Sequence, residues 1–249
     1  MKYNKLGQTD LVVSELCLGT MTWGTQNSAD DAFYQIEKSI DAGINFIDTA
    51  ELYPVNPISG VTQGESERIL GEWLSRSNVR DELIIATKIA GNGPKHIRNG
   101  EGITGKSLFT AINASLKLLK TDYIDLYQLH WPNRGSYHFR QNWRFDPTKQ
   151  DKNLVLDHMN EVLEACDILK KEGKVRAFGL SNESAWGTAQ WLRISEDKDL
   201  PRMASIQNEY SLMCRIFDTD LAELSHNENV GLLSFSPLAT GILSGKYLD

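Results

Sequence analysis

Four side chains in this sequence are suited to proton transfer: Asp48, Tyr53, Lys88 and His130. Asp48, Lys88 and His130 each end an apolar run, and Tyr53 follows Asp48 in the next loop. A buried lysine paired with a carboxylate stays ionised, and a phenol beside its ammonium is expected to have a lowered pKa. We therefore predict that Tyr53 exchanges a proton near neutral pH, and that His130 hydrogen-bonds a substrate oxygen.

A structural explanation of the same residues is also open. A buried pair between Asp48 and Lys88 could serve only to stabilise the ends of two strands, with Tyr53 as a packing residue. We favour the functional interpretation because all four side chains occur at or just after strand ends.

The elements that must position these side chains alternate between strand and helix along the whole chain. A hairpin is expected over residues 2–6 and 11–16. Buried strands are expected at 16–19, 46–48, 83–88, 123–130, 175–180, 204–208 and 231–235. Strands that are apolar on both faces are typical of a parallel sheet covered by helices. With no linker or change of composition, we expect one α/β domain over residues 1–249.

Polar residues at the carboxyl ends of the strands favour a barrel over an open sheet. These residues are Asp48, Lys88, His130, Asn182, Gln207 and Ser236. The strand ends of a barrel converge on one face, where the active site lies, whereas those of an open sheet spread along an edge. The predicted fold is therefore a (β/α)8 TIM barrel with an N-terminal β-hairpin.

Composition narrows the class of partner. The net charge is -7 and no basic stripe is present, so we expect no nucleic acid. No apolar run is long enough to cross a membrane, and the N-terminus lacks a signal sequence, so we expect no membrane and a cytoplasmic location. The three cysteines are far apart, and the five histidines show no metal-ligand spacing, so no metal is predicted.

Several motifs occur together in one order. They are Leu18-Gly19-Thr20-Met21-Thr22-Trp23-Gly24, residues 43–50 with Tyr53, residues 121–130, Gly179-Leu180-Ser181-Asn182, Gln207-Asn208, and Ser236-Pro237-Leu238 through Gly245-Lys246-Tyr247. On these motifs the chain resembles the aldo-keto reductase family, in particular its Tas-like branch, over essentially its whole length.

The resemblance implies an NADPH-dependent enzyme that reduces a small-molecule carbonyl on a (β/α)8 barrel. Tyr53 matches the family's general acid, and Lys88 and Asp48 match the residues that tune it. His130 matches the residue that orients the carbonyl oxygen. The oligomeric state and the particular substrate stay open.

The resemblance also implies a cofactor site and a substrate mouth. Ser181, Asn182 and Gln207 would hold the nicotinamide carboxamide, and Phe235 would stack on the ring. The remaining cofactor residues would be Gly19, Thr20, Met21 and Asp48 near the first strands, and Ser236, Pro237, Leu238, Gly241, Ser244 and Lys246 in a loop around the pyrophosphate. Trp23, Tyr53 and Trp131 would line the mouth, although plain hydrophobic cover explains the two tryptophans equally well.

The sequence departs from the family pattern after the seventh strand. In relatives an eighth strand and further helices close the barrel and bind the adenosine. We find no eighth strand, so we expect the chain to lack it together with the C-terminal helices, as a truncation or fragment would. The preference for NADP over NAD then stays undetermined.

Two alternative functions stay open. Residues 100–107, GEGITGKS, fit the phosphate-binding pattern GxxxxGK[ST]. That pattern needs a strand running directly into its first glycine, whereas a polar loop precedes Gly100 and Thr104 looks like a helix N-cap. A regulatory subunit that binds the cofactor with little turnover is the second alternative.

Overall fold

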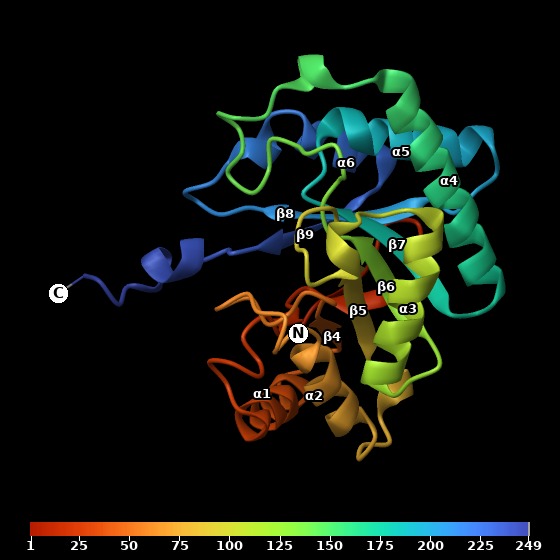
Figure 1. The fold of residues 1–249 in the computed structure, drawn as a ribbon. Helices are drawn as coiled ribbons and strands as arrows, with labels where there is room; N and C mark the ends of the chain where they lie inside the picture. The colour runs from red at the N-terminus through yellow and green to blue at the C-terminus, as the bar shows by residue number, and fades with distance from the viewer. Residues whose placement is uncertain (249) are drawn as a thin grey trace.

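The computed structural model describes residues 1–248, and its central feature is a curled parallel β-sheet (Figure 1). The sheet has seven strands, ordered as they occur along the chain. They are β3 (Leu18–Gly19), β4 (Phe46–Asp48), β5 (Ile84–Ile89), β6 (Ile124–Leu129), β7 (Val175–Ser181), β8 (Met203–Glu209) and β9 (Gly231–Phe235). Every neighbouring pair is parallel. The predicted barrel-type α/β fold with seven strands is confirmed, and within residues 1–248 the outer strands β3 and β9 each have one neighbour.

Helices cover the outer face of this sheet (Figure 1). They are α1 (Ala29–Asp41), α2 (Glu65–Leu74), α3 (Gly105–Leu119), α4 (Lys152–Lys171), α5 (Ala185–Asp197) and α6 (Leu221–Glu228). Ser28 and Thr104 cap α1 and α3 with reciprocal capping boxes, as their residue types predict. None of the helices within residues 1–248 carries an apolar stretch of the length that a bilayer requires.

The residues just before two helices set where these helices begin. Helix α4 starts at Lys152, because the Asp151 side chain accepts hydrogen bonds from the backbone N–H groups of residues 153 and 154. Helix α6 starts at Leu221, after a separate 3₁₀ turn at Ile216–Asp218.

Alternation along the strands decides which side chains face the barrel interior. On β5, Ile85 and Ile89 belong to the large core under the helices, whereas Ile84 and Ala86 belong to a smaller inner core. Side chains two residues apart in a strand share a face. Lys88 therefore points into the barrel, where it is 0% exposed.

The predicted N-terminal hairpin is confirmed and closes one end of the inner core. It consists of β1 (Tyr3–Lys5) and β2 (Val12–Ser14). Leu6, Leu11 and Val13 are buried in the inner core with residues near the N-terminal ends of the strands, such as Phe46 and Ile84. The carboxyl ends of the strands are therefore left free to form a site.

Candidate active site

Three adjacent strands deliver the predicted reactive side chains to one end of the barrel. Asp48 is the last residue of β4, Lys88 lies near the end of β5, and His130 follows β6 directly. Strands β4, β5 and β6 are neighbours in the sheet. Tyr53 comes from the loop after β4, and its backbone N–H donates to the carbonyl of Ala50.

The Lys88 ammonium lies at the centre of this cluster. Its Nζ is 2.5 Å from Asp48 Oδ2, 2.8 Å from the Thr49 carbonyl oxygen and 3.4 Å from the Tyr53 hydroxyl. Burial acts to lower the pKa of Lys88, but Asp48 and then Tyr53 outweigh it, so the pKa is raised. The lysine therefore stays positively charged, and the predicted pairing of Asp48, Lys88 and Tyr53 is present.

The expected lowering of the Tyr53 pKa is wrong. Burial of the hydroxyl group raises the pKa of Tyr53 above its ordinary value, and the nearby Lys88 charge opposes this rise without cancelling it. The sequence places a cation beside the phenol, but it does not show how closely the surrounding protein encloses the oxygen. At neutral pH Tyr53 is therefore a protonated phenol.

His130 lies beside the phenol as an uncharged imidazole. Its ring centroid is 5.7 Å from that of Tyr53 in an edge-to-face arrangement. Burial first, and the Lys88 charge second, lower the pKa of His130 well below its ordinary value. Its Nδ1 is buried with no hydrogen-bond partner among the described residues. A neutral ring of this kind can donate a hydrogen bond without acting as an acid.

The side chains predicted to hold a carboxamide lie next to His130, at the end of β7, directly after it, and on β8. Asn182 Nδ2 donates to the His130 carbonyl at 3.0 Å and to Ser181 Oγ at 3.1 Å. Ser181 Oγ donates to the Gln207 carbonyl at 2.9 Å. Asn182 Oδ1 is buried with no partner among residues 1–248. A buried acceptor without a partner fits a ligand that donates an amide N–H to it.

The other residues predicted to bind the cofactor come from two segments, one beside Asp48 and one after β9. Thr20 donates its N–H to the Asp48 carbonyl, and Gly19 pairs with Asp48 in the sheet. Met21 is 43% exposed at the end of this segment. In Figure 1 the chain after β9 extends away from the sheet. That segment carries Ser236, Pro237, Leu238, Gly241, Ser244 and Lys246, and it includes a 3₁₀ turn at Ala239–Ser244. No hydrogen bond or ion pair joins it to the reactive cluster among residues 1–248.

The two tryptophans predicted to line a substrate mouth differ in their position. Trp131 lies beside the reactive cluster, with its ring centroid 4.9 Å from that of His130. Trp23 is 0% exposed in the core under the helices, and its indole N–H donates to Gln35. Its backbone carbonyl accepts a hydrogen bond from Ser66 on α2, and its side chain packs in the core under the helices. The placement of Trp23 therefore favours the alternative of hydrophobic packing.

Sequence reasoning missed residues of the long segment after His130. Ser136 Oγ donates to the Asn182 carbonyl at 2.6 Å, and His138 Nε2 lies 3.2 Å from Asn208 Nδ2. These contacts place the Phe139 ring 6.3 Å from His130 and 6.3 Å from Phe235. The length of the segment was the only signal in the sequence, and it does not indicate which of its residues turn inward.

Gln128 was also missed, although its position could have indicated it. It lies two residues before His130 on β6 and therefore faces the barrel interior. Gln128 Nε2 donates to Asp48 Oδ1 at 2.8 Å. A polar residue inside an apolar strand, at the inward position, was the available signal.

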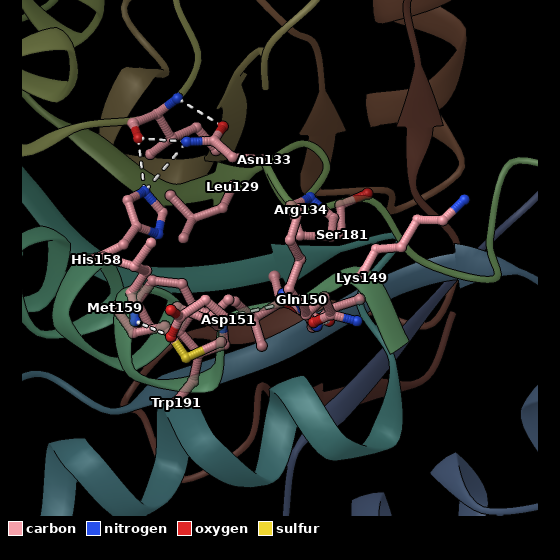
Figure 2. A pocket seen from close by; sticks show the side chains of 16 residues that line it. Leu129, Asn133, Arg134, Lys149, Gln150, Asp151, His158, Met159, Ser181 and Trp191 are labelled. Atoms are coloured by element: carbon pink, nitrogen blue, oxygen red, sulfur yellow. Dashed lines mark hydrogen bonds and ion pairs between the residues drawn. The ribbon is translucent and has the colours of Figure 1, made fainter. Parts of the chain in front are cut away.

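A separate cavity of about 360 Å³ lies beside the cluster, between the ends of β6 and β7 and helices α4 and α5. Figure 2 shows Leu129 and Ser181 on one side of it, and His158, Met159 and Trp191 on the other. It shares Ser181 with the carboxamide residues, but Asp48, Tyr53, Lys88 and His130 do not line it.

The phosphate-binding pattern lacks the structure that such a loop needs. Strand β5 ends at Ile89, and a 3₁₀ turn at Arg98–Gly100 precedes the second half of the pattern. Thr104 caps α3 through the Ser107 backbone and side chain. The second half of the pattern is therefore the ordinary start of helix α3.

The fold and the cluster together define a class: a barrel-type α/β protein with ionisable side chains at the carboxyl ends of its strands. Comparison with known proteins narrows this class. The family model described as Aldo/keto reductase family matches residues 15–249. The chain belongs to the aldo/keto reductase family, whose members are oxidoreductases.

Individual relatives agree with this assignment. Protein tas of Escherichia coli is 42% identical over 253 residues, which cover 100% of this chain and 71% of that protein. The uncharacterized oxidoreductase YrpG of Bacillus subtilis is 31% identical, covering 100% of this chain and 70% of its own length. Norsolorinic acid reductase stcV of Emericella nidulans is 32% identical over 92% of this chain and 55% of its own length.

Proposed function

We propose that this chain is an NADPH-dependent reductase that converts an aldehyde or a ketone to an alcohol, with Tyr53 as general acid. One observation carries the proposal. The Lys88 ammonium contacts both the Asp48 carboxylate and the Tyr53 hydroxyl in a buried site at the carboxyl ends of the strands. Active sites of barrel enzymes lie at this face.

The proton in this proposal comes from Tyr53. Its raised pKa keeps the phenol protonated at neutral pH, so it can donate to an oxygen on which negative charge develops. The phenolate left behind faces the Lys88 ammonium, which stabilises it. Asp48 and the Thr49 carbonyl fix the ammonium in place, so little reorganisation accompanies the transfer.

His130 has a positioning role in the proposal. Because its ring is neutral, it can donate one hydrogen bond to the substrate carbonyl oxygen without competing as an acid. Its neighbours Tyr53 and Trp131 supply aromatic surface on either side. A small carbonyl compound would therefore pack against these aromatic rings, and its oxygen would accept hydrogen bonds from Tyr53 and His130.

The cofactor assignment is supported by the donor and acceptor pattern beside the cluster. When bound, a reduced nicotinamide supplies the hydride that the protein itself cannot supply. The unpartnered Asn182 Oδ1, with Ser181 and Gln207 next to it, fits the carboxamide of such a ring. Phe235 would stack on the face of the nicotinamide ring, and Lys246 would bind the pyrophosphate of the cofactor.

The test is NADPH oxidation by the full chain against a panel of aldehydes, ketones and quinones. Turnover of at least one of these carbonyl compounds is expected. Tight NADPH binding without any turnover would favour the regulatory alternative, and failure to bind NADPH would contradict the proposal. ATP with magnesium should not raise the unfolding temperature, because the phosphate-binding pattern is a helix start.

A further inference from the structure

The cavity between the ends of β6 and β7 and helices α4 and α5 is not used by the proposed reaction. Its volume of about 360 Å³ lies within the usual range for small-molecule sites, which is about 300–1,000 Å³. Apolar side chains supply most of its wall, among them Leu129, Val155, Met159, Leu180 and Trp191. A cavity of this size and lining favours a ligand with an apolar body.

The charged side chains around the cavity are already paired within the protein. Arg134 Nη1 donates to Glu183 Oε2 at 2.8 Å, and the Glu183 side chain is almost fully buried. The exposed Lys149 has its Nζ 3.4 Å from Asp146 Oδ2. The Asp151 carboxylate caps α4 by accepting from two backbone N–H groups. The cavity therefore favours an uncharged ligand.

His158 on α4 gives the cavity a hydrogen-bonding atom that the described part of the chain does not use. Its Nε2 is 2.6 Å from the Ile103 carbonyl oxygen, and because a carbonyl can only accept, Nε2 carries the proton. Asn133 Nδ2 lies 3.2 Å from the same nitrogen, but it donates to the Ile103 carbonyl at 2.7 Å. In the neutral ring Nδ1 is therefore an acceptor, and none of residues 1–248 donates to it. Figure 2 shows His158 on the wall of the cavity, with one ring nitrogen directed to Asn133.

We propose that this cavity is a second ligand site, which binds an uncharged aromatic molecule and accepts a hydrogen bond from its N–H or O–H group at His158 Nδ1. Aromatic surface lies next to that acceptor, because the Trp191 ring centroid is 6.5 Å from that of His158 in an edge-to-face arrangement. The site is separate from the reactive cluster and shares only Ser181 with the carboxamide residues. The proposal therefore does not depend on the proposed reaction.

Indole and benzofuran are the probes, because they have the same two fused rings and differ in one ring position. Indole has an N–H there, and benzofuran has an oxygen that cannot donate. In calorimetric titration of the full chain, indole should bind about tenfold more tightly than benzofuran, which is the effect of one hydrogen bond. His158→Phe keeps an aromatic ring without the acceptor, so the ratio of the two dissociation constants should fall close to one. The Ile103 carbonyl keeps its hydrogen bond from Asn133 in this variant.

Two further variants test the location of the site by filling the cavity. Val155→Phe and Leu154→Trp should each weaken the binding of both probes by about tenfold or more, because the added atoms occupy the space of the ligand. Leu154 is 68% exposed, so its replacement should leave the fold intact. Ile168→Phe is the control, because Ile168 lies on the same helix, is 47% exposed and does not line the cavity. It should bind both probes as the parent does.

Three results would overturn the proposal. They are the absence of indole binding by the parent chain, indole binding that Val155→Phe and Leu154→Trp leave unchanged, and a preference for indole that survives in His158→Phe. Binding of NADPH is measured separately and decides the proposed function, whichever result the two probes give.

Discussion

A fully buried lysine is the residue on which the site depends. Lys88 has 0% exposure, and an ammonium in such a place is costly unless several oxygens surround it. Asp48, the Thr49 carbonyl and the Tyr53 hydroxyl provide them. Replacement of Asp48 or of Lys88 by a neutral residue would leave the other charge uncompensated in the barrel, which typically costs about 3–5 kcal/mol.

Glu67 on α2 is a second buried ionisable residue, and it should make stability depend on pH. Burial raises its pKa from 4.5 to about 7, against the opposing effect of its hydrogen bond from Thr87. The folded protein therefore binds this proton more tightly than the unfolded chain does. Stability should fall by about 3 kcal/mol as the pH rises from the ordinary value to the raised one, and then level off. Glu67→Gln should remove this fall, as measured by urea unfolding at several pH values.

Glu65→Gln is the control for that measurement, because its carboxylate is partly exposed on the same helix. Glu65→Gln should show the same fall in the free energy of unfolding with rising pH as the parent chain. If Glu67→Gln also shows this fall, then Glu67 does not cause it.

At the scale of single residues, the sequence predicted which residues gather in the cluster better than it predicted what surrounds each of them. Asp48, Lys88 and His130 could be predicted because each interrupts or ends an apolar strand. The raised pKa of Tyr53 could not, because it depends on atoms from several elements that enclose the hydroxyl. Trp23 was assigned to the mouth from its motif, but packing against α1 and α2 decides its direction.

The helices are positioned by close contacts as well as by apolar faces. A Cβ added at Gly71 of α2 would lie 2.0 Å from the Leu118 carbonyl oxygen of α3. Intrinsic helix propensity alone would make Gly71→Ala stabilising by about 1 kcal/mol. The clash with backbone atoms should reverse that sign and destabilise by about 1–3 kcal/mol, because α2 and α3 must move apart. Thermal unfolding of the variant measures this, and a raised midpoint would contradict the account.

At the scale of elements, the order of strands and helices followed from their apolar patterns, but the path of the long connection after β6 did not. Its contacts run to β7 and β8, through Ser136 to Asn182 and through His138 to Asn208. Those partners are 46 and 70 residues away along the chain. No local pattern encodes pairings of that kind, because several polar residues in the segment could have made them.

At the scale of the whole molecule, the hairpin and the site lie at opposite ends of the same barrel interior. The hairpin residue Leu11 is 1% exposed in the inner core. Leu11→Ala should destabilise by about 2–5 kcal/mol, because it leaves a cavity where the strands converge. Val12→Ala, at the next position along the hairpin, which is 46% exposed, should change stability by less than about 0.5 kcal/mol. Equal effects in urea unfolding would show that the hairpin does not close the core.

The central claim is that Tyr53 donates the proton during carbonyl reduction, and Tyr53→Phe tests it most directly. The substitution removes only the hydroxyl that lies 3.4 Å from Lys88 Nζ, so the binding of NADPH should stay within about twofold of the parent value. The rate of NADPH oxidation with the best carbonyl substrate should fall by about 100-fold or more, since general acid catalysis is lost. Retained NADPH binding together with the parental rate of turnover would contradict the account.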